Sequence, residues 1–169
     1  MENLAVYPGS FDPITFGHLD LLERGLKIFD RITIAIAANP GKTSLFSLEE
    51  RCDMIREALS KHPLKDRVTV DLFHGLLVDY IKTVPARAIL RGLRAISDFE
   101  YEFQMALMNR KLNPDVETLF IMTGMRWIYI SSRIIKEVVK SGGCVTGLVP
   151  ENVEKMLAKR LSGHNGTLY

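Results

Sequence analysis

The sequence predicts an α/β fold: a doubly wound, Rossmann-like parallel sheet of five strands, with helices on both faces and a C-terminal helical extension. Five short runs are rich in Val, Ile, Leu and Phe without polar alternation, which is typical of strands covered on both faces. Segments with apolar residues at three- and four-residue spacing, typical of helices, separate these runs. Strands that alternate with helices imply right-handed crossovers between parallel strands.

The strands are expected at 4–7, 32–37, 68–73, 88–90 and 118–122. The helices are expected at 17–29, 48–60, 76–83, 98–112 and 131–141, with a last helix that begins near Glu151 after Pro150. Ser47 to Glu50 and Ser97 to Glu100 both match the capping box, in which a serine and a glutamate satisfy each other's orphan amides. These two matches define the starts of two helices.

Length and composition indicate one compact domain that covers residues 1–169. Apolar residues make up 47% and charged residues 25%, which excludes a disordered or fibrous chain. The formal charge of +2 comes from 22 basic and 20 acidic residues, so the basic surplus that drives binding to a nucleic-acid backbone is missing. We therefore expect no nucleic-acid partner, and any phosphate recognition must be local.

Neither a signal peptide nor a membrane span is predicted, because no apolar run approaches the roughly 20 residues that a bilayer requires. We expect a cytoplasmic protein without a membrane partner. Cys52 and Cys144 stand far apart and match neither a disulfide framework nor a zinc site, so both are expected to be free thiols, with Cys52 filling the core.

The stretch Y-P-G-S-F-D-P-I-T-F-G-H at 7–18 reads as a strand-to-helix turn. Gly9 and Gly17 let the backbone approach a ligand, and Pro8 and Pro13 stiffen the loop between them. His18 is expected in the first turn of the next helix, where free amides and the helix dipole favour an anion. The alternative is a tight connection with one buried histidine.

In an open parallel sheet the ligand lies beyond the carboxyl ends of the strands, where strand order reverses. Polar residues follow four of the predicted strands at that edge: Ser10 and His18, Lys42, Arg91 and Arg94, and Ser131 and Ser132. Arg91 is expected at the end of its strand and Arg94 in the loop after it. The convergence of these cations favours a phosphate-binding site.

Each of these groups also has a structural interpretation. Arg91 and Arg94 could be surface arginines paired with Asp98 or Glu102, and Ser131 or Ser132 could simply cap the helix that follows. The carboxylates Asp12, Asp98, Glu100 and Glu102 have no spacing that demands an acid–base pair, and we expect none of them to act as a general base.

Taken together, several blocks resemble the phosphopantetheine adenylyltransferases of the nucleotidyltransferase superfamily that carries the T-x-G-H motif. The blocks are residues 7–18, F-S-L-E-E-R at 46–51, L-R-G-L-R-A at 90–95, D-F-E-Y-E at 98–102, I-S-S-R-I-I-K-E-V at 130–138, V-T at 145–146 and V-P-E-N-V at 149–153. The resemblance covers nearly the whole chain, and the blocks at 90–95 and 98–102 are more specific than the T-x-G-H motif.

The resemblance implies transfer of the adenylyl group of ATP to 4′-phosphopantetheine, with release of pyrophosphate and with Mg²⁺ as cofactor but no predicted protein ligand to the metal. It implies catalytic roles for His18, Ser10, Lys42 and Arg91. It implies ATP contacts from Ser10, Phe11, His18, Gly92, Leu93, Arg94, Glu102, Trp127, Ile130, Ser131 and Ser132. Phosphopantetheine contacts are implied for Ser10, Lys42, Leu77 and Arg91, and the assembly implied is a homo-oligomer, a hexamer.

Three features depart from the family pattern. Phe16 stands where the family usually has asparagine, and Arg133 stands where it usually has a third serine. The loop from Thr123 to Arg126 is also less typical. Two alternatives stay open: a related adenylyl- or cytidylyltransferase with another phosphorylated acceptor, and a non-catalytic nucleotide or coenzyme A binder on the same fold. The R-G-L-R-A block disfavours the first, and the presence of His18, Lys42, Arg91 and Arg94 together disfavours the second.

Overall fold

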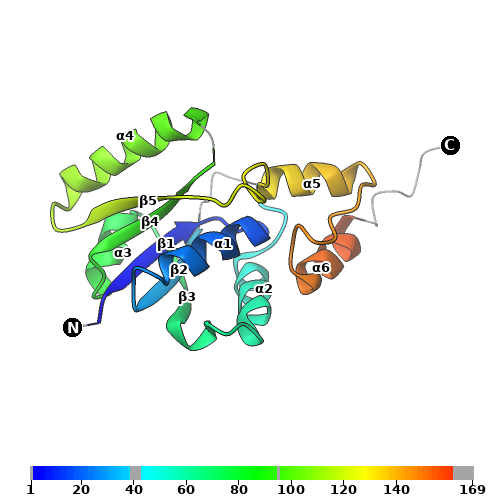
Figure 1. The fold of residues 1–169 in the computed structure, drawn as a ribbon, viewed down its shortest axis with the longest axis horizontal. Helices are drawn as coiled ribbons and strands as arrows, with labels where there is room; N and C mark the ends of the chain where they lie inside the picture. Colours follow the sequence, from blue (N-terminus) through cyan, green and yellow to red (C-terminus); the bar gives the residue numbers. More distant parts are fainter. Residues whose placement is uncertain (1, 39–42, 95, 162–169) are drawn as a thin grey trace.

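The computed structural model describes residues 2–38, 43–94 and 96–161. For residues 96–98 it describes the backbone but not the side chains. Its sheet contains β1 (Leu4–Gly9), β2 (Arg31–Ala38), β3 (Val68–His74), β4 (Ala88–Leu93) and β5 (Glu117–Met122), as Figure 1 shows. The order is β3-β2-β1-β4-β5, and every pair is parallel. Because the strand order reverses between β1 and β4, the carboxyl ends of these two strands form the switch point that the sequence predicted.

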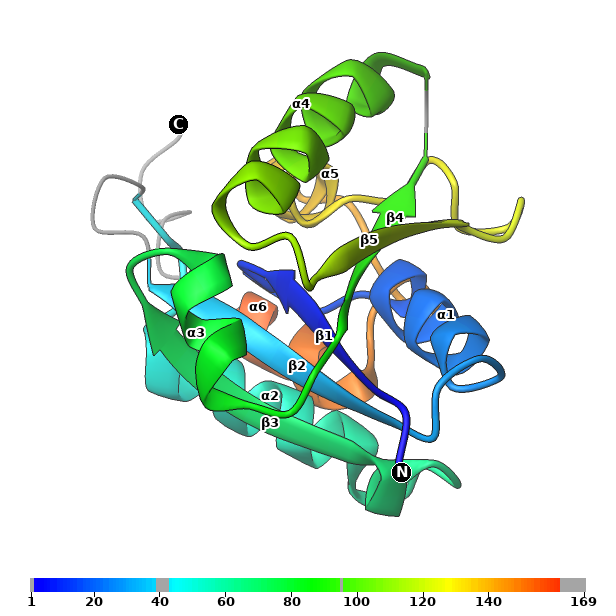
Figure 2. The same ribbon diagram turned by 90° about the vertical axis from the view of Figure 1, so that its left-hand side faces the viewer.

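Helices cover both faces of the sheet, which confirms the doubly wound fold (Figure 2). One face carries α1 and α2, and the other carries α3 and α4. Helix α6 packs on α2, and α5 packs on α6. The bounds are α1 (Phe16–Gly25), α2 (Leu48–Ser60), α3 (Leu77–Thr83), α4 (Ile96–Leu112), α5 (Ser132–Lys140) and α6 (Glu151–Leu161), with a short 3-10 helix at Lys65–Arg67 that the sequence did not predict.

Two apolar clusters hold the layers together. The larger joins one sheet face to α1, α2, α5 and α6 through fully buried residues such as Leu22, Ile55 and Leu157. The smaller joins the other face to α3, where Ile81 packs against Val6 and Ile89. None of the described side chains of α4 belongs to either cluster, so this helix contributes little to the core.

Two predicted ends are wrong by three residues or more. The helix expected at 17–29 ends at Gly25, because a tight turn, in which the amides of Ile28 and Phe29 donate to the Gly25 carbonyl, returns the chain to β2. The strand expected to end at Leu90 continues to Leu93, because β4 keeps pairing with β5 up to Leu93 and Met122. Arg91 therefore lies within a strand and not after it.

Other local predictions are confirmed. The amides of Ser47 and Glu50 bond to each other's side chains at 2.8 and 3.2 Å, so the first capping box forms. By contrast, the helix start predicted from Ser97 to Glu100 is wrong, because α4 already begins at Ile96 and Ser97 lies within the helix; the side chain of Ser97 lies outside the described residues. Both cysteines are free thiols, with Cys52 in the core and Cys144 exposed. Within the described part of the chain, no helix combines the length and hydropathy needed to cross a bilayer.

Candidate active site

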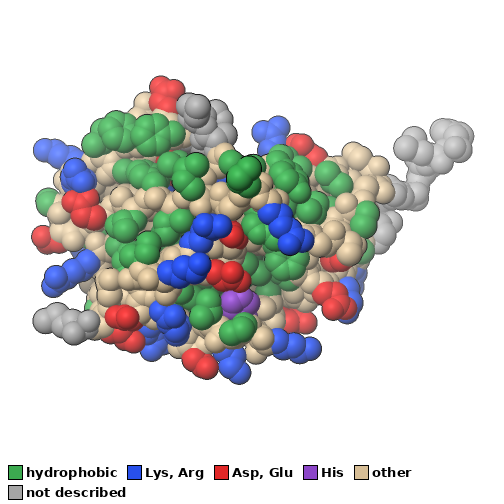
Figure 3. All heavy atoms as spheres, viewed as in Figure 1, with side chains coloured by type: hydrophobic (Ala, Val, Ile, Leu, Met, Phe, Trp, Pro, Cys, Tyr) green, Lys and Arg blue, Asp and Glu red, His purple; other side chains and the backbone are tan. Residues whose placement is uncertain are grey.

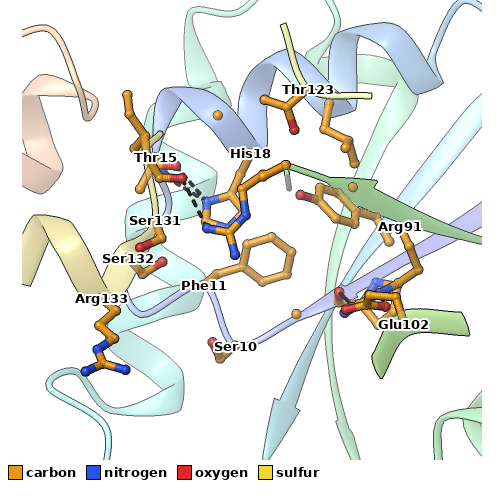
Figure 4. A pocket seen from close by; sticks show the side chains of 18 of the residues that line it. Ser10, Phe11, Thr15, His18, Arg91, Glu102, Thr123, Ser131, Ser132 and Arg133 are labelled. Atoms are coloured by element: carbon orange, nitrogen blue, oxygen red, sulfur yellow. Dashed lines mark hydrogen bonds and ion pairs between the residues drawn. The ribbon is translucent and has the colours of Figure 1, made fainter. Parts of the chain in front are cut away.

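The turn between β1 and α1 places a histidine at the first turn of a helix. Thr15 is the N-cap of α1, and His18 is the third residue of that helix. The Nδ1 atom of His18 lies 3.0 Å from both the backbone nitrogen and the Oγ1 atom of Thr15, contacts that Figure 4 marks. A backbone N–H can only donate, so Nδ1 must be unprotonated and the neutral ring carries its proton on Nε2.

The surroundings keep this imidazole neutral. Burial, together with the positive charges of Arg94 and Arg91, lowers the pKa of His18 to about 4. At neutral pH the ring therefore carries no charge and offers Nε2–H as a hydrogen-bond donor. A neutral donor can contact a phosphate oxygen without the desolvation cost of an imidazolium.

The strands β1 and β4 separate at the switch point. They pair only through Ala5 with Ala88 and Val6 with Ile89, and beyond these residues β4 follows β5 alone. Arg91 spans the resulting gap, because its Nη1 atom donates to the Pro8 carbonyl at 2.9 Å. The absence of pairing beyond Ile89 makes room for a pocket between the two strands.

A carboxylate from α4 fixes the orientation of Arg91. Its Nε atom donates to Glu102 Oε2 at 2.7 Å and its Nη2 atom to Glu102 Oε1, a two-pronged ion pair. Figure 4 shows the two side chains together. Burial opposes ionisation of the guanidinium, but the Glu102 carboxylate raises the pKa of Arg91 above its usual range. The pairing with Glu102 that the sequence left open is therefore real, and it coexists with a position in the pocket wall.

The N-terminus of α5 faces the same space. Ser131 caps this helix by accepting a hydrogen bond from the Ile134 amide at 3.1 Å, and it keeps its own hydroxyl hydrogen for a ligand. The hydroxyl of Ser132 instead donates to the Pro13 carbonyl at 2.7 Å, so it ties the helix to the β1–α1 turn. The first amides of α5 have no partner within the helix, and they suit phosphate oxygens.

These elements enclose a central pocket of about 390 Å³. Predicted site residues that line it are Ser10, Phe11, His18, Arg91, Gly92, Arg94, Glu102, Ile130, Ser131 and Ser132. Arg133 adds a further positive charge to the lining, and Glu102 is its single carboxylate among the described residues. The pocket thus carries a local excess of positive charge that the net charge of the chain does not reveal.

Three of the predicted site residues that the structure describes do not line the central pocket. Leu93 ends β4, and Trp127 packs against Phe16 with ring centroids 5.5 Å apart. Leu77 is partly buried against the smaller core cluster on the α3 side of the sheet. Lys42 lies outside the described residues. Their roles stay predictions.

Some pocket residues were not predicted from the sequence: Tyr7, Thr15, Tyr101 and Thr123. Thr15 had a readable signal, because a threonine three residues before His18 fits an N-cap whose partner is the third helical residue. Tyr7 is buried, and burial raises the pKa of its hydroxyl well above the usual range. The positive charges of Arg91 and Arg94 lower this pKa, but by less than burial raises it. Its hydroxyl therefore stays protonated at neutral pH.

Two of the three departures from the family pattern, Phe16 and Arg133, have structural explanations. Phe16 replaces a polar contact with an aromatic one, since its ring packs on Trp127, which in turn lies under the Arg126 guanidinium at 4.5 Å. Arg133 lies at the mouth of the central pocket, where it pairs with Glu137 at 3.0 Å, and Figure 4 shows it pointing away from His18.

The described residues do not form a metal cage. No group of three or more His, Cys, Asp or Glu side chains comes together among them, and Glu102 is already paired with Arg91. Magnesium prefers carboxylate and phosphate oxygens and keeps several waters. The donors found here do not fit a site that the protein builds for Mg²⁺ by itself.

Comparison with known proteins identifies the class to which this fold and site belong. The model of the cytidylyltransferase-like family matches residues 6–138. The structure of a bifunctional NMN adenylyltransferase/ADP ribose pyrophosphatase from Francisella tularensis shares the fold, with a TM-score of 0.67 and 16% identity over 94% of this chain and 50% of that one. The chain belongs to the cytidylyltransferase-like family of nucleotidyltransferases.

Curated relatives make the assignment more specific. The phosphopantetheine adenylyltransferase of Desulfosudis oleivorans is 58% identical over 94% of this chain and 92% of its own length. That of Desulfatibacillum aliphaticivorans is 57% identical over 95% of this chain and 90% of its own length. Within the family, the chain is thus one of the phosphopantetheine adenylyltransferases, which confirms the activity in coenzyme A biosynthesis that the sequence predicted.

Proposed function

We propose that the chain transfers the adenylyl group of ATP directly to the phosphate of 4′-phosphopantetheine, giving dephospho-coenzyme A and pyrophosphate without a covalent intermediate. One observation supports this most strongly: a neutral histidine donor and two arginines line one pocket at the switch point of the sheet. The acceptor phosphate is already a competent nucleophile, so catalysis reduces to positioning and charge stabilisation.

On the nucleotide side, Nε2–H of His18 would donate to an oxygen of the α-phosphate as charge develops on it. Arg94, Ser131 and the first amides of α5 would hold the remaining phosphates, because together they supply cationic and neutral donors at one edge of the pocket. Ser10, Phe11, Gly92, Leu93, Glu102, Trp127 and Ile130 complete the proposed ATP contacts.

On the acceptor side, Arg91 and Lys42 would hold the phosphate of 4′-phosphopantetheine with help from Ser10. The ion pair with Glu102 supports this role, because it fixes the direction of the Arg91 guanidinium before the substrate arrives. Leu77 would contact the pantetheine arm, although it lies outside the central pocket. For this contact, the pantetheine arm would extend beyond the residues that line the central pocket.

Mg²⁺ would enter with ATP. When bound, it would supply positive charge to the triphosphate, held by phosphate oxygens and water, since the described residues do not offer a ligand set of their own. Every step assigned to the chain is therefore a step of positioning or hydrogen bonding by His18, Arg91, Arg94 and Ser131.

A homo-oligomer, specifically a hexamer, is the assembly we propose. The support comes from α4, whose apolar side chains stay exposed, including Tyr101 at 64%, Met108 at 54% and Leu107 at 50%. Figure 3 shows hydrophobic side chains gathered over this helix. An apolar surface of this extent is typical of a protein–protein contact, and a second copy of the chain would cover it. We also propose that the chain forms a single domain and that it is located in the cytoplasm.

A panel of acceptors tests the proposed function. Pyrophosphate release from ATP is measured with 4′-phosphopantetheine, nicotinamide mononucleotide, nicotinate mononucleotide and phosphocholine as acceptors. Release with 4′-phosphopantetheine alone supports the proposal. Release with another acceptor would favour a related nucleotidyltransferase, and ATP binding without release would favour a non-catalytic binder.

A further inference from the structure

Asp12 lies in the turn between β1 and α1 but does not line the central pocket. It is only 4% exposed, and its carboxylate accepts hydrogen bonds from the amides of Leu45 at 3.0 Å and Phe46 at 2.9 Å. It also pairs with Nζ of Lys136, which lies on α5, at 2.6 Å. Three segments that are distant in the sequence therefore meet at one buried side chain.

The Asp12 carboxylate keeps its negative charge although it is buried. Burial opposes ionisation of Asp12, but the hydrogen bond from Lys136 and the amides of Leu45 and Phe46 lower the pKa of its carboxyl below the usual range. A buried ion pair is weak evidence for stability, because apolar residues of similar volume often serve a core as well or better. Its position between two substrate-binding elements suggests a role beyond stability.

The turn held by Asp12 is the one that carries His18. Phe11, the residue before Asp12, has a φ of 45°, in the left-handed region that non-glycine residues rarely adopt. Its ring meets the His18 imidazole edge to face, with centroids 5.1 Å apart. A strained residue keeps its conformation only where its surroundings hold it, so the anchors of Asp12 also fix the ring against which His18 packs.

A second contact ties the same turn to α5. Ser132 donates to the Pro13 carbonyl at 2.7 Å, one residue beyond Asp12. Lys136 and Ser132, both on α5, thus bond to two adjacent residues of the turn, Asp12 and Pro13. Ser131 caps the N-terminus of α5. The distance between α5 and the turn therefore sets the spacing between His18 and the phosphate-binding amides at that N-terminus.

We infer that Asp12 and Lys136 form a positioning pair, which sets the α5 N-terminus against the His18 turn and anchors the Leu45–Phe46 segment beside it. The inference rests on the proposed roles of His18 and α5. Neither residue contacts a substrate in this scheme. Because a misplacement of about 1 Å at a reacting centre can cost 10²-fold in rate, loosening the pair should reduce turnover more than substrate binding.

Three variants test the pair. Lys136→Met removes the cation and leaves Asp12 with its two backbone amides. Asp12→Asn/Lys136→Met removes both charges, so no unpaired ion is buried. Lys136→Arg keeps the ion pair as the conservative rescue. The matched control is Glu151→Gln/Lys155→Met, which removes an ion pair of the same length, 2.6 Å, between two exposed side chains on α6.

Steady-state kinetics at 25 °C with ATP and 4′-phosphopantetheine, and Tm by calorimetry, are the readouts. We expect kcat to fall 10- to 100-fold in Lys136→Met and in the double variant, KM for ATP to change less than threefold, and Lys136→Arg to restore most of the turnover. The control should match the wild type. A purely structural pair would lower Tm without lowering kcat in the folded enzyme.

Turnover within twofold of wild type in either folded variant would overturn the inference, as would KM values that rise in step with the loss of kcat. Failure of both variants to fold would assign the pair to stability alone and would overturn it too. An inactive wild-type protein would instead refute the proposed function, so the two failures are distinguishable in the same assay.

Discussion

The Nδ1 atom of His18 accepts a hydrogen bond from the Thr15 amide at 3.0 Å, and this contact leaves Nε2–H as the donor of the imidazole. The geometry gives the histidine of the T-x-G-H motif one fixed tautomer. It also distinguishes His18 from an acid–base residue, since a ring whose pKa is about 4 stays neutral throughout the physiological range.

Replacement of His18 by alanine should remove turnover while preserving nucleotide binding. Loss of one donor that stabilises developing charge typically costs about 10²–10³ in rate. We expect kcat to fall by at least that factor, and the Kd for ATP measured by calorimetry to change less than fivefold. Near-normal turnover in the variant would refute the proposed role of His18 in stabilising charge on the α-phosphate.

The protonation state of His18 can be observed directly by NMR. Long-range ¹H–¹⁵N spectra should show the Nε2–H tautomer at pH 7 and titration of this ring near pH 4. A ring that titrates between pH 6 and 7, or one protonated on Nδ1, would contradict the structure. Spectra of His18→Gln identify the resonance.

The same pKa predicts how stability depends on pH. Because the folded pKa of His18 lies below the unfolded value of about 6.5, the unfolded state binds more protons between pH 4 and 6.5. The stability contribution of the neutral ring is therefore present above pH 6.5 and is lost as the pH falls toward 4, by at most about 3 kcal/mol. Urea unfolding of the wild type and His18→Gln at pH 7.5 and 5 should show a smaller loss in the variant.

Glu102→Gln should weaken binding of the acceptor. The substitution keeps the shape of the side chain but removes the charge that orients Arg91, and loss of a charged partner in a partly buried pair costs about 1–3 kcal/mol. We expect kcat/KM for 4′-phosphopantetheine to fall roughly 5- to 150-fold. Glu117→Gln, which removes the exposed partner of Arg110, is the matched control, and equal effects of both variants would argue against a special role of the Arg91 pair.

A charge on the exposed face of α4 should break the assembly. Leu107→Lys and Met108→Lys place a cation in the contact that we propose, and light scattering after gel filtration should show smaller particles than for the wild type. Ile28→Lys charges an equally exposed apolar residue in the turn after α1 and should leave the mass unchanged. A wild-type protein that is monomeric at micromolar concentration would refute the oligomer itself.

The sequence by itself determined the alternation of strands and helices, the approximate positions of these elements and the edge of the sheet where the pocket lies. Local rules suffice for these features, because apolar runs, helical spacing and a serine cap each depend on a few neighbouring residues. The same rules identified the turn at 7–18 and most of the polar residues around the pocket. They were wrong about the end of β4, since its continuation to Leu93 depends on pairing with β5, a strand more than twenty residues away.

Only the tertiary structure decided how these residues work together. The sequence left open whether Arg91 forms an ion pair, and the packing of α4 over β4 brings Glu102 to the guanidinium while Arg91 still lines the pocket. Asp12 had no readable partner at any local spacing, because Lys136 stands 124 residues further along the chain. The His18 pKa likewise depends on burial and on two arginines, one just after β4 and one within it, which no local pattern encodes.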